Sequence, residues 1–111
     1  MSGTAAPRVA VVTGAGSATG IGFAIARALG SAGRRVLIAS TTDRIHERVA
    51  DLRREGIDAI GVVCDLTSET GVAALLAAAD GAGSADVLVN NAGMAVLGEM
   101  DSLTDLAQVS L

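Results

Sequence analysis

The chain has 111 residues, the length of one domain at most. Half of the residues are hydrophobic, so a core of useful size is possible and a soluble globular domain is expected. The net charge of −4, from eight basic and twelve acidic side chains, argues against a nucleic-acid-binding surface.

Membrane-spanning and disulfide-linked secreted proteins are also excluded. The longest apolar run, at residues 72–79, is far shorter than the roughly 20 residues that cross a bilayer, so no membrane span is expected. The amino-terminal "MSGTAAPR" has neither the charged start nor the apolar centre of a secretory signal. Cys64 is the single cysteine, which leaves no internal disulfide and no paired metal ligands. We therefore expect a cytoplasmic protein without a metal site.

The first predicted strand is the apolar run "VAVV" at residues 9–12, and the glycine-rich stretch "TGAGSATGIG" follows it at residues 13–22. A predicted helix comes next, with apolar residues recurring at helical spacing along one face. These residues are Ile21, Ala24, Ile25, Ala28, Leu29 and Ala32. We expect this face to be buried and Gly33 to end the helix.

The second predicted strand lies at residues 35–39 and the third at residues 59–64, because both runs are almost continuously apolar. The stretch between them predicts a second helix. Its apolar residues Ile45, Val49 and Leu52 lie on one side, with charged residues elsewhere.

A third helix is predicted after the third strand, where Thr67 or Ser68 can cap its exposed amide groups. Its apolar residues are Val72, Leu75, Leu76 and Ala79. A fourth strand follows at residues 86–90. The resulting βαβαβαβ order predicts an α/β fold with right-handed crossovers, helices on both faces, and a four-stranded parallel sheet in the order 3-2-1-4.

The glycines after the first strand match the needs of a phosphate-binding turn. Such a turn needs one glycine where the chain bends off the strand, and others where backbone approaches the phosphates and the helix packs on the sheet. A glycine pattern alone is weak evidence, so the strand before it and the helix after it carry much of the argument. The Walker phosphate-binding loop is excluded, because it requires a lysine and the chain has none.

Three motifs in order give the chain its resemblance to the classical short-chain dehydrogenase/reductase family. They are "TGAGSATGIG" after the first strand, "CDLT" at residues 64–67 after the third, and "NNAG" at residues 90–93 after the fourth. The resemblance implies a Rossmann-like fold that binds NAD or NADP. It also implies oxidation of an alcohol or reduction of a ketone, including 3-oxoacyl reductase-like chemistry, by hydride transfer.

The resemblance further implies which residues hold the dinucleotide. The turn at residues 14–22 would hold the pyrophosphate. Asp65 would accept a hydrogen bond from the adenine amino group, and Leu66 would offer its backbone to the ring. The "NNAG" motif would line the adenosine side. The residues expected to bind the cofactor are thus Gly14, Ser17, Gly20, Ile21, Gly22, Ser40, Thr41, Asp65, Leu66, Asn90, Ala92 and Gly93.

The first turn departs from the family pattern in length. The family usually has three residues between "TG" and "GIG", whereas this chain has five. We interpret Gly14 as the bend, Gly20 and Gly22 as the pair that opens the helix, and residues 15–19 as an enlarged loop.

The end of the second strand favours NADP over NAD. NAD-selective relatives place an acidic side chain there, which would repel a 2′-phosphate. This chain has Ser40 and Thr41 at those positions, with Arg44 close by. Asp43 lies nearer the helix, where a capping or dipole role is favoured over a role at the ribose.

The family's catalytic residues are a Tyr that acts as acid and base, a Lys four residues later, a Ser and an Asn. This chain contains no Tyr and no Lys, and the position resembling the Asn is Ser110. No catalytic residue is therefore assigned. Residues 1–111 are expected to form the dinucleotide-binding part of a single, incomplete Rossmann-like domain, inactive alone.

Two alternatives stay open: a non-catalytic dinucleotide-binding module, and a truncated product without a stable fold. In the favoured hypothesis, the complete enzyme is a homo-oligomer. It would act on a small carbonyl or alcohol substrate.

Overall fold

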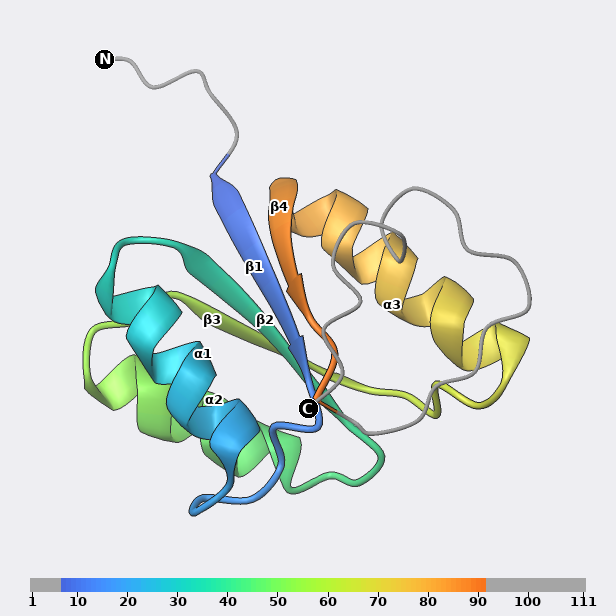
Figure 1. Cartoon of the computed structure of the whole chain (residues 1–111), viewed down its shortest axis with the longest axis horizontal. Coiled ribbons are helices and arrows are strands. Elements are labelled where there is room, and N and C mark those ends of the chain that lie inside the picture. Colours follow the sequence, from blue (N-terminus) through green and yellow to red (C-terminus); the bar gives the residue numbers. More distant parts are fainter. Residues whose placement is uncertain (1–6, 92–111) are drawn as a thin grey trace.

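The computed structural model describes residues 7–91 as three layers, with a central sheet between two layers of helix (Figure 1). Strands and helices alternate along this part of the chain, as predicted. They are β1 (Arg8–Thr13), α1 (Ile21–Ser31), β2 (Arg35–Ser40), α2 (Ile45–Arg54), β3 (Ala59–Val63), α3 (Glu69–Ala82) and β4 (Ser84–Val89). None of the helices described is long and apolar enough to cross a membrane.

The sheet is parallel throughout and has the strand order β3-β2-β1-β4, which confirms the predicted topology. Val11 of β1 pairs with Leu37 of β2 on one side and with Leu88 of β4 on the other. Helices α1 and α2 cover one face of the sheet, and α3 covers the other (Figure 1). All four strands therefore end at the same edge, where the loops after them converge.

The core lies on both faces of the sheet because successive strand residues point in opposite directions. In β1, Ala10 and Val12 belong to the cluster under α1 and α2, whereas Val9 and Val11 belong to the cluster under α3. All four side chains are fully buried. The continuous apolar runs of the sequence are thus explained by strands that are covered twice.

The buried face of α1 differs from the one that the apolar spacing predicted. Gly22, Phe23 and Ala26 are buried, while Ile21 is 63% exposed. The helix approaches its neighbours through glycines: a Cβ on Gly30 would clash with the side chain of Ile57. Of the predicted face, Ile25 and Leu29 do pack against the core, whereas Ile21, Ala24, Ala28 and Ala32 are exposed. The buried face is therefore rotated from the predicted one toward Gly22, Phe23 and Ala26.

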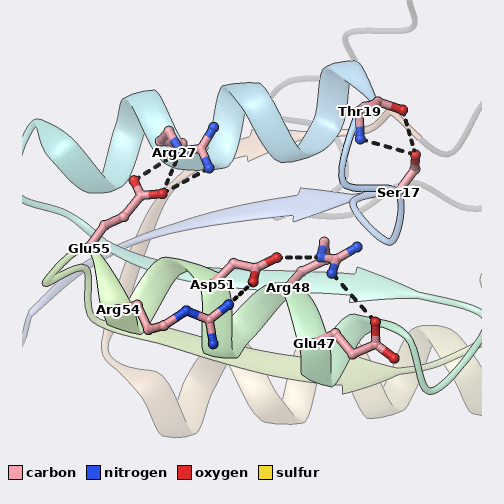
Figure 2. A network of polar contacts seen from close by, with 8 residues as sticks. All are labelled: Ser17, Thr19, Arg27, Glu47, Arg48, Asp51, Arg54 and Glu55. Atoms are coloured by element: carbon pink, nitrogen blue, oxygen red, sulfur yellow. Dashed lines mark hydrogen bonds and ion pairs between the residues drawn. The ribbon is translucent and has the colours of Figure 1, made fainter.

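Phe23 joins α1 to α2 through two arginines. The guanidinium of Arg27 lies 4.8 Å from the ring centroid of Phe23, and that of Arg48 lies 5.7 Å from it. Figure 2 shows that Arg27 also reaches across to Glu55, with Nη2 and Oε2 2.8 Å apart, and that Arg48 donates to Asp51. This network fixes α1, which begins at the end of the glycine-rich turn, against its neighbouring helix.

Helix α3 is seated at its first turn by Gly71. The Gly71 amide donates to the Ser68 hydroxyl at 3.0 Å, so Ser68 is the capping residue of the two predicted candidates. A Cβ on Gly71 would collide with the backbone carbonyl of Asp65. Near the other end of the same helix, a Cβ on Gly81 would meet no atom within 4 Å.

Gly71→Ala and Gly81→Ala should therefore change stability in opposite directions. We expect Gly71→Ala to lower the free energy of unfolding by about 2 kcal/mol, because backbone must move to admit the methyl group. Gly81→Ala should raise it by about 0.5 kcal/mol through helix propensity. Urea unfolding followed by circular dichroism measures both. Equal effects of the two substitutions would contradict the close packing of Gly71 on Asp65.

Candidate functional site

A cleft of about 330 Å³ opens where β1, β2 and β3 end. Ligands of open parallel sheets bind at this edge, and the volume lies in the range of small-molecule sites. The cleft is lined by Thr13, Gly14, Gly16, Ser17, Ala39, Ser40, Thr41, Thr42, Arg44, Cys64, Asp65, Leu66 and Thr67. Three loops from separate parts of the sequence thus contribute to one site.

The glycine-rich turn leaves β1 at Gly14, whose φ of +67° is in the left-handed region that favours glycine. The Ala15 amide then donates to the carbonyl of Ala39 at 3.1 Å. A Cβ on Gly16 would lie 3.0 Å from the Cβ of Ser40. The first half of the turn therefore rests directly on the end of β2.

The second half of the turn brings α1 close to the end of β1. Gly20 has an extended backbone and directly precedes the helix, and as a glycine it has no side chain that could cap the helix. A Cβ on Gly22 would lie 2.6 Å from the carbonyl oxygen of Gly14 and 2.7 Å from Nδ2 of Asn91. Gly22 therefore allows the helix to pack at this point, the third of the roles that a phosphate-binding turn requires.

The ends of β1 and β4 are joined by polar contacts. Buried Thr13 donates its hydroxyl proton to Oδ1 of Asn90 at 3.0 Å and accepts from the Asn91 amide at 3.0 Å. Nδ2 of Asn91 donates to the carbonyl of Gly14 at 3.1 Å. Sequence reasoning selected Asn90 and missed Thr13 and Asn91. The signal available in the sequence was that "TG" lies at the end of the first strand and "NN" at the end of the fourth, two strands predicted to be neighbours in the sheet.

The residues after β2 form the middle of the cleft. The Ser40 hydroxyl donates to the Thr42 carbonyl at 2.9 Å and accepts from the Thr42 amide at 3.3 Å, which fixes this corner. The residue before α2 is Arg44, which makes no side-chain cap hydrogen bond, so Asp43 is not the helix cap, and the dipole role expected of it as the alternative stays a prediction. Backbone contacts close this turn instead, including the one from the His46 amide to the Asp43 carbonyl at 3.0 Å.

Arg44 is the one arginine in the lining of the cleft. Within residues 7–91, six arginines form ion pairs and Arg53 donates to the carbonyl of Ala59. Arg44 is exposed and has no carboxylate partner in the same range. Its positive charge is therefore available to an anion in the cleft.

Asp65 stands at the β3 side of the cleft, with its carboxylate held by Thr67. Oδ1 of Asp65 accepts from the Thr67 hydroxyl at 2.6 Å and from the Thr67 amide at 2.9 Å. These hydrogen bonds hold the pKa of Asp65 below its ordinary value. Beside it, burial and the Asp65 charge raise the pKa of the Cys64 thiol, so Cys64 is neutral and suited to lining rather than to nucleophilic attack.

The expected cofactor residues fall into three groups. Gly14, Ser17, Ser40, Thr41, Asp65 and Leu66 line the cleft. Gly20, Ile21, Gly22 and Asn90 lie in the adjoining turn, helix and strand end, outside the lining. Ala92 and Gly93 are outside the described residues. Residues 7–91 contain no cluster of side chains that could hold a metal ion.

Comparisons with known proteins agree with this architecture. A family model described as short chain dehydrogenase matches residues 8–109. A protein named as ketoacyl reductase 1 of the granaticin polyketide synthase of Streptomyces violaceoruber is 46% identical over 105 residues, which cover 93% of this chain and 38% of that protein. Cis-4-hydroxycyclohexanecarboxylate dehydrogenase of Sinomonas cyclohexanicum is 48% identical over 91 residues, or 81% of this chain and 36% of the relative. The chain thus spans somewhat more than a third of these relatives' length.

Solved structures show the same likeness. An actinorhodin polyketide ketoreductase with NADPH superposes with a TM-score of 0.73 at 43% identity, covering 79% of this chain and 34% of the ketoreductase. A metagenomic short-chain oxidoreductase in complex with NADP gives a TM-score of 0.71 at 38% identity, covering 83% of this chain and 42% of the other.

The Asp65–Thr67 contact predicts a measurable titration. Thr67→Val removes the hydroxyl donor, so we expect the pKa of Asp65 to rise toward its ordinary value. Thr70→Val, in the first turn of α3, is the matched control and should leave it unchanged. Carboxyl-carbon NMR shifts followed through acid pH measure both. The lowered pKa makes Asp65 stabilising above its unfolded-state pKa, and this stability is lost as pH falls through the folded-state value. An unchanged Asp65 titration in Thr67→Val would contradict the assigned contact.

Proposed function

The chain belongs to the short-chain dehydrogenase family, and we propose that it forms the dinucleotide-binding part of an NAD(P)-dependent oxidoreductase. One observation carries the proposal. A single cleft at the ends of the strands brings together the glycine turn, the loop after β2 with Arg44, and the Asp65 loop. When bound, the reduced dinucleotide would supply the hydride that converts a ketone to an alcohol, and the oxidised dinucleotide would accept hydride in the reverse reaction.

The residues present fit such a cofactor. The positive φ of Gly14 lets the turn bend off β1, and the absence of a Cβ on Gly16 and Gly22 lets the turn pack on Ser40 and α1 pack on the end of β1, as a phosphate-binding turn requires. Asp65 lines the cleft with its pKa held below the ordinary value, and in this proposal its carboxylate would accept a hydrogen bond from the adenine amino group. Leu66 lines the same side and would contact the ring.

NADP is proposed over NAD because of the groups after β2. Ser40 and Thr41 bring no carboxylate to the cleft, and Arg44 brings a cation without a carboxylate partner in residues 7–91. A 2′-phosphate carries negative charge, so an unpaired guanidinium attracts it. Two similar structures with NADPH or NADP support the same choice.

The proposed substrates are small carbonyl compounds or alcohols, with 3-oxoacyl groups favoured by the relatives named as ketoacyl reductases. The sequence contains no Tyr and no Lys, so no residue of this chain is assigned the family's acid or base role. That observation keeps a non-catalytic dinucleotide-binding module as the second candidate. In the complete enzyme, we propose a homo-oligomer.

The role of Arg44 is tested with two nucleotides that differ only by the 2′-phosphate, adenosine 2′,5′-bisphosphate and 5′-AMP. We expect the 111-residue chain to bind the bisphosphate more tightly in calorimetric titration. Arg44→Gln should weaken bisphosphate binding about tenfold, because a charge-assisted contact is lost, and should leave 5′-AMP binding nearly unchanged.

Arg8→Gln is the matched control. It makes the same change in net charge at the start of β1, at the opposite end of the strand from the cleft. Equal losses in the Arg8 and Arg44 variants would show a general charge effect and contradict the assignment. Absence of binding by the unmodified chain would contradict the proposed dinucleotide site.

A chimera tests whether this chain can act as the dinucleotide-binding part of a reductase. The matching part of the actinorhodin ketoreductase, about a third of that enzyme, is replaced by this chain. We expect NADPH oxidation with ketones and 3-oxoacyl thioesters from the chimera. We expect turnover at least about 100-fold lower from the 111-residue chain alone, because a positioned general acid typically contributes 10²–10⁴-fold.

Circular dichroism establishes that the chimera is folded before activity is compared. A folded chimera that fails to bind NADPH would contradict the proposal. Turnover by the chain alone at the rate of the chimera would instead show that residues 1–111 already contain the proton donor.

A further inference from the structure

A second groove lies apart from the dinucleotide cleft, between α2 and the outer strand β3. Its volume is about 550 Å³, and residues of these two elements line it. None of these residues also lines the dinucleotide cleft. The lining combines four apolar residues with three basic ones, namely Val49, Ala50, Ile60 and Gly61 with His46, Arg53 and Arg54. We call it the α2–β3 groove.

The α2–β3 groove carries a surplus of positive charge. Within residues 7–91, no aspartate or glutamate belongs to its lining. Arg54 is paired with Asp51, as Figure 2 shows, whereas Arg53 has no carboxylate partner among the same residues. Nε and Nη2 of Arg53 donate to the carbonyl of Ala59 at 3.1 and 2.9 Å. Because a guanidinium has donors on all three nitrogens, the Nη1 side of Arg53 can still bind an acidic group.

The outer edge of β3 presents backbone groups beside the same groove. In the described part of the chain, β3 pairs with β2 and with no other strand. The Asp58 carbonyl and the Cys64 amide both bond to β2. Because successive residues of a strand direct their peptide groups to opposite sides, Gly61 and Val63 direct theirs away from β2. These groups have the arrangement that can pair with a further strand.

The residues along this edge limit what can add to it. Arg53 already covers the Ala59 carbonyl, so the open edge begins at Gly61. A Cβ on Gly61 would lie 2.7 Å from Cγ2 of Val49, so this position is kept without a side chain. Val63 is 42% exposed and offers an apolar contact. A short extended segment with a carboxylate near Arg53 and an apolar side chain near Val63 therefore fits.

We propose that the α2–β3 groove is a docking site for an acidic segment of another protein, which adds to the edge of β3 as a short strand. Its backbone would exchange hydrogen bonds with Gly61 and Val63, and one of its carboxylates would bind Arg53. The unpaired basic charge selects an acidic segment over a basic one. The backbone edge selects a peptide over a nucleic acid or a lipid surface. This inference does not depend on the dinucleotide site.

The experiment follows the amide NMR signals of the isotope-labelled 111-residue chain during titration with capped peptides of about eight residues, a usual strand length. A peptide of alternating Glu and Val should shift the amide signals of Gly61 and Val63. A peptide of alternating Lys and Val should bind about tenfold more weakly, because it meets like charge. N-methylation of the Glu–Val peptide at alternate residues should abolish binding, because it removes the donors that strand pairing needs.

Two substitutions with matched controls test the two contacts. Arg53→Gln should weaken binding of the Glu–Val peptide about fivefold through loss of a charge-assisted contact, whereas Arg44→Gln, the same charge change at the dinucleotide cleft, should leave it nearly unchanged. Val63→Pro removes an outward-facing amide proton and keeps the bonds to β2, so it should weaken binding about tenfold. Val63→Thr keeps that proton and is its control.

Several results would overturn the inference. They are equal binding of the Glu–Val and Lys–Val peptides, equal losses in the Arg53 and Arg44 variants, unchanged binding in Val63→Pro, and the absence of any shift at Gly61 and Val63 with either peptide. Shifts at these residues with inorganic polyphosphate or phosphatidylserine vesicles, and none with the Glu–Val peptide, would also overturn it by assigning the groove to another anion. Thermal unfolding of each variant separates loss of fold from loss of contact.

Discussion

The close approach of α1 to the end of β1 is the constraint on which the site depends. Gly22 packs where a Cβ would lie 2.6 Å from the Gly14 carbonyl, and the same carbonyl accepts from Asn91. Helix, strand end and the end of β4 thus meet at one peptide group. A larger residue at position 22 would push the helix outward, and the turn that rests on β2 would move with it. Gly14, which lines the cleft, is thus held in place by packing just outside the cleft.

Contacts farther along α1 keep the helix in that position. Phe23, the only Phe, Tyr or Trp of the sequence, is buried and contacts the guanidinium groups of Arg27 and Arg48, and Arg27 also binds Glu55 at the end of α2. Exposed ion pairs contribute little stability individually. Here their geometry matters more than their energy, because they oppose rotation of α1 over the sheet. The orientation of the amide groups at the start of α1 therefore depends on Phe23 and Arg27, which lie in the first two turns of the helix.

The sequence allowed the sheet and its strand order to be predicted because doubly covered strands must be continuously apolar, and parallel crossovers have one hand. The same reasoning identified the buried side of α2, where Ile45, Val49 and Leu52 are all buried. It was only partly right for α1, where Ile25 and Leu29 pack on the core but the close packing of Gly22 and Gly30 is not registered by an apolar pattern. It also missed Asn91, because a contact between the ends of β1 and β4 depends on register, which local spacing does not specify.

Charge compensation makes the proposed phosphate site compatible with a net charge of −4. Among the described residues, the arginines at the start of the strands pair with Asp58 and Asp86, and most of those on the helices pair with Glu47, Asp51 or Glu55. These pairs cancel most of the positive charge where it stands. Arg44 has no carboxylate partner at the cleft. The one carboxylate that lines the cleft, that of Asp65, accepts hydrogen bonds from the hydroxyl and the amide of Thr67. Fields at a surface are set by the nearest unpaired charges rather than by the total, since salt screens beyond about 10 Å. The pairing of the other arginines is therefore as much a part of the proposed phosphate site as Arg44 itself.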